Sequence, residues 1–139
     1  MLRTVFFLCM IPLLFSGCKA PSSRPHHARS ISVGMAHNLT LQQMGHPSFK
    51  IIDVRTPNEF SSGHITGAIN IDWNSNKQAL RSLSTTDTLL LYCRSGRRSQ
   101  LAMTYLAEHG FQYLFHMEGG LIQWKKDIKN LTPSPLNEH

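Results

Sequence analysis

The residue best suited to chemistry is Cys93, which directly follows the apolar run at residues 89–92. A helix with one apolar face is expected from Ser99 onward. The loop between them holds one glycine and three arginines: Gly96, Arg94, Arg97 and Arg98. Loop N–H groups, a helix N-terminus and guanidinium groups all stabilise negative charge, and a cysteine in such surroundings ionises more readily. The spacing therefore predicts a thiolate nucleophile at Cys93 rather than an inert buried thiol.

The residues around Cys93 are the candidates for binding a substrate anion: Arg94, Ser95, Gly96, Arg97, Arg98 and Ser99. Three arginines cannot all point inward from one tight loop, so we expect Arg94 and Arg98 to hold the anion by charge-assisted hydrogen bonds. Gly96 permits a backbone conformation in which N–H groups converge. For Ser99 we expect a cap on the following helix or a hydrogen bond within the loop, with contact to the sulfur as the alternative.

Strand and helix patterns alternate along the chain, which predicts a parallel sheet covered by helices on both faces. Thr56 and Glu59 form a capping box with a proline between them, and this predicts a short helix that Gly63 ends. Cys93 follows a strand, and sites in such sheets form at the carboxyl ends of strands. The expected strands are 31–33, 49–54, 68–71, 88–92 and 113–115, and the expected helices are 36–45, 57–62, 78–83, 99–109 and one beginning after Gly120.

Composition and charge describe one globular domain. The chain has 139 residues, of which 41% are hydrophobic and 16% charged, with a formal net charge of +6. Part of the positive charge lies in the cysteine loop, and no basic stripe with interleaved aromatic residues is present. We therefore expect no nucleic acid as a partner.

The N-terminus has the pattern of an export signal. Arg3 precedes an apolar stretch at residues 5–15 that is too short to span a bilayer as a helix. Ser16 and Gly17 before Cys18 resemble a bacterial lipobox, in which that cysteine is lipidated and becomes the new N-terminus. Lys19 is not the aspartate of an inner-membrane retention signal, so the resemblance implies an outer-membrane anchor facing the periplasm of a Gram-negative cell. An ordinary cleaved signal is the alternative.

These features give a simple domain organisation. We expect a lipoprotein-type signal peptide at 1–17, a flexible tether at 18–30, a domain at 31–128 and a loose tail at 129–139. Cys9 lies in the removed segment and Cys18 would carry lipid, so Cys93 is expected to be the remaining free thiol. One thiol cannot build an internal disulfide framework.

Four motifs in order make the chain similar to the rhodanese-like domain family in its single-domain form, over about residues 31–126. They are Asp53-Val54-Arg55 with Glu59-Phe60, the run at 63–70, the loop at 93–99, and Gly119-Gly120 with Trp124. The resemblance implies a five-stranded parallel sheet in an α/β sandwich and a sulfurtransferase activity. Cys93 matches the cysteine that accepts a sulfane sulfur, from thiosulfate in the archetypal reaction, and passes it to cyanide or a thiol. The reaction would be ping-pong, without a metal or organic cofactor.

Three more polar residues near the motifs are expected to support the loop rather than to react. Asp53 and Arg55 would form a charge pair that fixes the loop from behind. His64 would have a hydrogen-bonded framework role, because a thiolate that is already formed needs no base. Four further histidines have no metal-ligand spacing: His37, His46, His109 and His116.

Three alternatives remain open on sequence grounds. A cysteine phosphatase or arsenate reductase on a related fold needs an arginine at position 99, where this chain has Ser99. A non-catalytic rhodanese-like binding module is disfavoured by the presence of Cys93 with its basic loop. A thiol-redox or sulfide-handling role would use the same persulfide with another acceptor. The expected partners are small sulfur-containing anions and thiols, with membrane contact only through the N-terminal lipid, and we expect a monomer.

Overall fold

The computed structural model describes residues 27–131, and its centre is a parallel sheet of five strands in the order β1-β5-β4-β2-β3. The strands are β1 (His27–Ile31), β2 (Phe49–Asp53), β3 (Ala68–Asn70), β4 (Thr88–Tyr92) and β5 (Tyr113–Met117). The helices are α1 (Val33–Gln43), α2 (Pro57–Ser61), α3 (Trp73–Asn76), the 3₁₀-helix η1 (Lys77–Ser82), α4 (Arg97–Glu108) and α5 (Gly120–Leu131). The predicted α/β fold with a five-stranded parallel sheet is confirmed.

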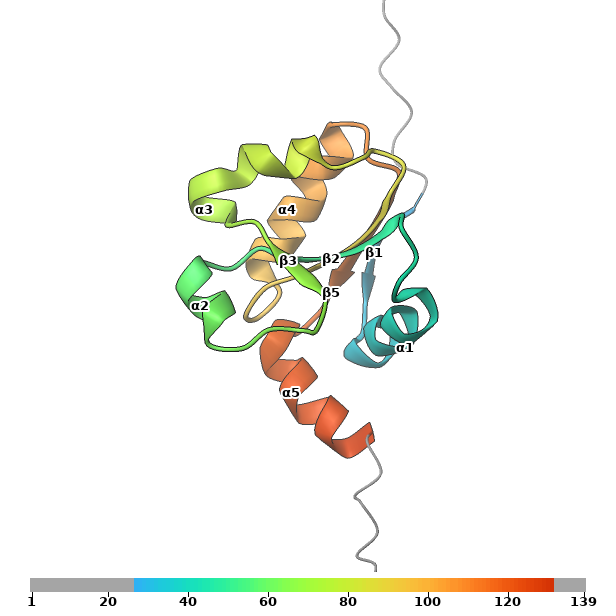
Figure 1. Ribbon diagram of the computed structural model, residues 1–139, viewed down its shortest axis with the longest axis vertical. Coiled ribbons are helices and arrows are strands. Elements are labelled where there is room, and N and C mark those ends of the chain that lie inside the picture. Colours follow the sequence, from blue (N-terminus) through green and yellow to red (C-terminus); the bar gives the residue numbers. More distant parts are fainter. Residues whose placement is uncertain (1–26, 132–139) are drawn as a thin grey trace, which may run out of the picture.

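Alternation along β4 builds a separate core on each face of the sheet. Leu89 and Leu91 pack with Leu106 of α4, in a cluster that also holds Cys93. Leu90 and Tyr92 join the opposite cluster, which includes residues of α1 and α5. Figure 1 shows the same two layers, with α3 and α4 on one side of the sheet and α1 and α5 on the other. As the central strand, β4 is buried on both faces and places the residue after it deep in the molecule.

The predicted capping box at the start of α2 is present. The Thr56 hydroxyl accepts from the Glu59 N–H, while the Glu59 carboxylate accepts from the Thr56 N–H at 3.1 Å. The helix ends at Ser61, and Gly63 follows with a φ of 126°. This short helix follows β2, and its Glu59 contacts Arg98 at the start of α4.

The first strand was predicted wrongly at 31–33, with residues 27–30 in the tether. β1 covers His27–Ile31 and pairs along its length with β5, from His27 beside Tyr113 to Ile31 beside Met117. It is an edge strand whose first four residues are exposed, so its sequence lacks the apolar pattern by which strands are recognised. Smaller differences are α3, whose start at Trp73 was not foreseen, and α5, which runs to Leu131, beyond the expected domain end at 128.

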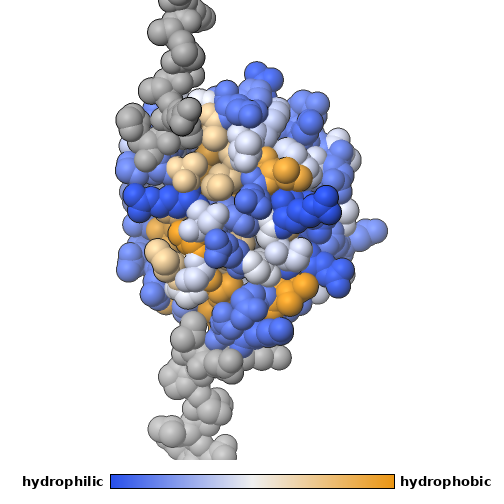
Figure 2. Space-filling view, turned by 180° about the vertical axis from the view of Figure 1, so that it is seen from behind, coloured by the Kyte–Doolittle hydropathy of each residue, from blue (hydrophilic) through white to orange (hydrophobic). Residues whose placement is uncertain are grey.

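The signal peptide at 1–17, Cys18 and the tail beyond Leu131 lie outside the described residues. Within residues 27–131, no helix has both the length and the apolar character needed to cross a membrane. Figure 2 shows apolar side chains on one face as separate patches among hydrophilic ones. The large exposed apolar side chains come from several different elements and include Met35, Leu41, Met44, Leu101 and Ile122.

Candidate active site

Cys93 lies directly after β4, at the carboxyl end of the central strand, and only 1% of its surface is exposed. It is the free cysteine of the described residues. Its side chain belongs to the α4 face of the sheet, where it lies in the same cluster as Leu91 and Ala102. A substrate atom that reacts here must therefore reach a recessed sulfur.

The first N–H groups of α5 hold the loop after Cys93 in place. Leu121 N–H donates to the Cys93 carbonyl at 2.8 Å, and Ile122 N–H donates to the Arg94 carbonyl at 3.0 Å. Gly120 makes this approach possible, because a Cβ atom there would lie 2.5 Å from the Cys93 carbonyl oxygen. With two consecutive carbonyls turned toward α5, the next N–H groups of the loop are free to turn toward the sulfur.

Backbone and hydroxyl donors surround the sulfur of Cys93. Gly96 N–H donates to Sγ at 3.2 Å, and the Ser99 hydroxyl lies 3.7 Å from it. Burial raises the pKa of the Cys93 thiol, but hydrogen bonds from Ser99, Ser95 and Gly96 outweigh that effect, so the pKa is lowered overall. Gly96 has a φ of 102°, a conformation that residues with a side chain rarely adopt. These hydrogen bonds favour the thiolate form of Cys93, and they act mainly through dipoles rather than through arginine charges.

Ser99 is fully buried and does not cap α4, since Gly96 occupies the N-cap position. Its hydroxyl donates to the Gly96 carbonyl at 3.0 Å and also reaches the sulfur. The expected hydrogen bond within the loop and the alternative contact with sulfur are therefore both present, whereas the capping role is not.

Arg98 is bound by a carboxylate from another element. Its two terminal nitrogens donate to the two oxygens of Glu59, each at 2.7 Å. This pairing lowers the pKa of Glu59 from 4.5 to about 2 and raises the pKa of Arg98, on which the charge of Cys93 has a smaller effect. Arg98 was expected to bind substrate, but in the structure it ties the loop to α2.

Asp53 and Arg55 form the expected charge pair at the end of β2. The Asp53 carboxylate accepts from the Arg55 backbone N–H at 2.9 Å and from its guanidinium at 2.6 Å, and the same guanidinium nitrogen donates to the Gly63 carbonyl at 2.8 Å. The guanidinium also lies 5.8 Å from the centre of the Tyr92 ring. The pair therefore joins the end of β2 to the residue before Cys93 and to the turn after α2.

His64 is exposed and bonded within the α2 region. Its ring stacks on Phe60 at 3.8 Å between centroids, and its Nδ1 lies 3.0 Å from the Phe60 carbonyl oxygen. The framework role expected for His64 fits these contacts, but they fix the end of α2 rather than the cysteine loop.

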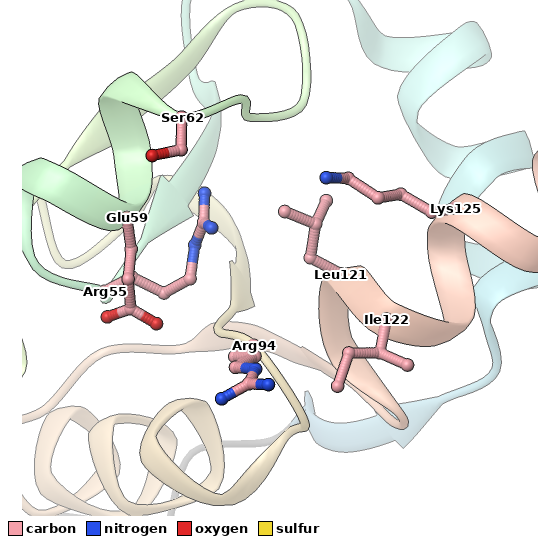
Figure 3. A pocket seen from close by; sticks show the side chains of 7 residues that line it. All are labelled: Arg55, Glu59, Ser62, Arg94, Leu121, Ile122 and Lys125. Carbon is pink, nitrogen blue, oxygen red and sulfur yellow. The ribbon is translucent and has the colours of Figure 1, made fainter.

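A cavity of about 280 Å³ opens beside the loop. Figure 3 shows Arg55, Arg94 and Lys125 around it, with Leu121 and Ile122 of α5 forming an apolar wall. Among the described residues neither Arg94 nor Lys125 has an ion-pair partner. Arg97 and Ser95 are exposed and do not line this cavity. The cavity is also lined by Ser62 and by Glu59, whose carboxylate is paired with Arg98, whereas Cys93 does not line it. The unpaired cations of its lining suit a small anion, and Arg94 is the loop arginine available to it.

Sequence reasoning missed His116 and Lys125. His116 is buried in β5, with its Nδ1 2.9 Å from the Ser99 hydroxyl. A histidine among apolar residues at the end of a strand could have indicated this buried position. Lys125 lies next to Trp124 in the last motif, but nothing local marked its direction toward the cavity. No group of three or more His, Cys, Asp or Glu side chains suited to a metal occurs among residues 27–131.

Comparisons with known proteins agree with this geometry. A family model described as "Rhodanese-like domain" matches residues 37–127. Thiosulfate sulfurtransferase 16, chloroplastic, of Arabidopsis thaliana is 37% identical over 110 residues, with 70% of this chain and 88% of the relative covered. Thiosulfate sulfurtransferase GlpE of Pseudomonas entomophila is 33% identical over 82 residues, covering 59% and 75%. The crystal structure of a rhodanese-like domain protein from Staphylococcus aureus has a TM-score of 0.60 at 29% identity, covering 69% and 90%.

Proposed function

Because this chain belongs to the rhodanese-like family, we propose that it is a sulfurtransferase in which Cys93 carries a sulfane sulfur from thiosulfate or a related donor to cyanide or a thiol. The observation that carries the proposal is the position of the Cys93 sulfur, recessed at the end of β4 and 3.2 Å from the Gly96 N–H. Two relatives bear the name thiosulfate sulfurtransferase, which supports the choice of donor.

In the first half-reaction the Cys93 thiolate attacks the outer sulfur of thiosulfate. A bond forms between Sγ and that sulfur, the sulfur–sulfur bond of thiosulfate breaks, and its electron pair leaves with sulfite. The lowered pKa of the Cys93 thiol supplies the nucleophile without a general base. The outer sulfur of thiosulfate is a single terminal atom, which suits a nucleophile that is 1% exposed.

In the second half-reaction an acceptor nucleophile attacks the outer sulfur of the Cys93 persulfide. The persulfide bond breaks, its electron pair returns to Sγ, and the product is thiocyanate from cyanide or a new persulfide from a thiol. The same donors that stabilise the thiolate then stabilise the leaving Sγ. Arg94 beside the cavity is the candidate for holding the sulfonate end of the donor.

Intact-mass measurement after treatment with thiosulfate tests the proposal. We expect one added sulfur atom, removed again by cyanide, and no addition in Cys93→Ser. Arg97→Gln is the matched control, because it changes an exposed residue of the same loop that does not line the cavity and should leave the addition unchanged. Persulfide formation in Cys93→Ser, or efficient hydrolysis of p-nitrophenyl phosphate by the unmodified protein, contradicts the proposal.

We also propose that the protein is exported and anchored by a lipid on Cys18, on the periplasmic side of the outer membrane. The support is the sequence alone: an apolar stretch at residues 5–15 followed by Ser16, Gly17 and Cys18, with Lys19 after it. Labelling of cells with a radioactive fatty acid should mark the protein in the outer-membrane fraction, and Cys18→Ala should abolish the label. Label retained by Cys18→Ala, or an unlabelled protein free in the periplasm, contradicts the anchor.

A further inference from the structure

His116 is a buried polar residue in β5 that the proposed sulfur transfer does not yet use. It is 4% exposed and pairs in register with Leu91 of β4, two residues before Cys93. The alternation along β5 directs its side chain to the same face as Leu114, which packs in the α4 cluster. Its ring also lies against the cysteine loop, since a Cβ atom on Gly96 would be 3.3 Å from His116 Cε1.

The Ser99 hydroxyl connects His116 to the reactive sulfur. Its oxygen lies 2.9 Å from His116 Nδ1, 3.0 Å from the Gly96 carbonyl oxygen and 3.7 Å from Cys93 Sγ. A hydroxyl has one proton to donate and two lone pairs to accept with. The carbonyl and a thiolate can only accept, whereas Nδ1 either donates or accepts according to the tautomer of the ring.

The two neutral tautomers of His116 have opposite effects on Cys93. If Nδ1 is unprotonated, it accepts the Ser99 proton, and none is left for the sulfur. If Nδ1 carries its proton, it donates to the Ser99 oxygen, and the hydroxyl proton stays available to the sulfur and the Gly96 carbonyl. Among the described residues Nε2 has no hydrogen-bond partner, so nothing on that side of the ring selects the first tautomer.

We propose that His116 is a positioning residue for Cys93, whose Nδ1–H donates to the Ser99 hydroxyl and thereby directs the hydroxyl proton to the thiolate. A thiolate attracts that proton, so ionisation of Cys93 and protonation at Nδ1 favour each other. The inference rests on the proposed role of Cys93 as nucleophile.

The surroundings of His116 agree with a neutral ring. Burial lowers its pKa, and the carboxylate of Glu118 raises it to a smaller extent. The groups facing it from neighbouring elements are the Ser99 hydroxyl from α4 and the loop of Cys93, while β1 places Ser30 beside it in register. The ionisable groups on these contacts are therefore Cys93 and Glu118, and the effect of His116 depends on its tautomer rather than on a positive charge.

Alkylation of Cys93 by iodoacetamide, measured against pH, tests the proposal without requiring sulfur transfer. His116→Leu keeps the side-chain volume but loses the donor, and the midpoint should rise by about one pH unit, which slows the reaction about tenfold at any pH well below both midpoints. His116→Asn places an amide nitrogen on Cγ where Nδ1 stood, so it should react within about twofold of the unmodified protein. Ser99→Ala should behave like His116→Leu.

The double variant decides whether His116 acts through Ser99. Adding His116→Leu to Ser99→Ala should change the alkylation rate by less than about twofold, because the connecting hydroxyl is already gone. Additive effects in the double variant, a normal midpoint in His116→Leu, or an equal loss in His116→Asn would each overturn the proposal.

Nitrogen NMR of the unmodified protein gives a second measurement that needs no variant to fold. The imidazole shifts of His116 should identify a proton on Nδ1 in the thiolate form, and an unprotonated Nδ1 would overturn the proposal. Cys93 that alkylates as expected but accepts no sulfur from thiosulfate would contradict the proposed function while leaving this assignment intact.

Discussion

The ion pair between Glu59 and Arg98 should couple the stability of α2 to the cysteine loop. Glu59→Gln is the informative change, because glutamine at this position can still complete the capping box with Thr56. What it removes is the carboxylate charge and one acceptor of the two-pronged contact, in which both distances are 2.7 Å. Arg98→Met removes the partner and keeps the aliphatic stem.

The expected magnitude follows from the exposure of the pair. The side chains of Arg98 and Glu59 are 22% and 30% exposed, which places the pair between surface pairs of about 0.2–1 kcal/mol and buried pairs whose disruption costs about 3–5 kcal/mol. The pKa of Glu59 falls from 4.5 to about 2, which without solvent screening would correspond to about 3 kcal/mol. Screening of this partly exposed carboxylate by solvent reduces the expected coupling to about 1.5 kcal/mol.

The same contribution should depend on pH in a defined direction. The folded pKa of Glu59 is below its unfolded value of 4.5, so the folded protein holds this proton less tightly than the unfolded chain. The stabilisation is therefore complete above pH 4.5 and is lost as the pH falls toward about 2. Glu59→Gln lacks this group and should lose less stability over that interval than the unmodified protein.

Urea unfolding of the unmodified protein, both single variants and the double variant measures the coupling. We expect a coupling energy of about 1.5 kcal/mol at pH 7 that decreases at pH 3. The Lys50–Asp87 pair, at 3.2 Å, is a matched control outside the loop, and Lys50→Gln should leave the Glu59–Arg98 coupling unchanged. A coupling below about 0.3 kcal/mol at pH 7, or one that is equal at both pH values, would refute the reasoning.

Three further changes test other parts of the site. Gly120→Ala would place a Cβ against the Cys93 carbonyl, so it should cost at least about 2 kcal/mol in urea unfolding and should also slow the alkylation of Cys93. Gly110 also has a positive φ but has open space around it, so Gly110→Ala should reduce the stability without changing the alkylation rate. Arg94→Gln should raise the KM for thiosulfate about tenfold with an unchanged alkylation midpoint, whereas Arg97→Gln, away from the cavity, should change neither. Asp53→Asn leaves the Arg55 guanidinium without its buried carboxylate and should cost about 3 kcal/mol in urea unfolding; a loss below about 1 kcal/mol would contradict its role as the anchor of β2.

Local patterns were sufficient where burial is complete. β4 was predicted at its observed bounds because a continuous apolar run between polar residues is typical of a strand covered on both faces. The capping box of α2 was likewise a short-range pattern. The prediction of β1 was wrong because this exposed edge strand forms through its pairing with β5, which is far away in the sequence, and not because of its own hydrophobicity.

The contacts around the sulfur also divide into those that a local sequence pattern predicts and those that depend on residues far away in the sequence. The loop and its glycine were recognisable, but the partner of Arg98 is 39 residues earlier in the chain and the partner of Ser99 is 17 residues later. The hydrophobic periodicity of the sequence does not predict such pairs, because they depend on which elements the strand order of the sheet brings together. Topology therefore decided which arginine remained available to a substrate.

In this site, the residues that stabilise the nucleophile are different from the residue that is available to bind the substrate. The thiolate is stabilised by the Gly96 N–H and by Ser99. The orientation of these donors depends on Gly96 in the loop and on Gly120 at the start of α5. The charge of Arg98 is paired with Glu59, and its interaction with Cys93 has a smaller effect on the pKa of Arg98 than this pairing has. Arg94 contacts neither the sulfur nor an acidic side chain among the described residues and faces the cavity. Changes in the cavity can therefore alter which sulfur donor is bound without altering the nucleophile, whereas changes at Gly96, Ser99 or Gly120 act on the nucleophile itself.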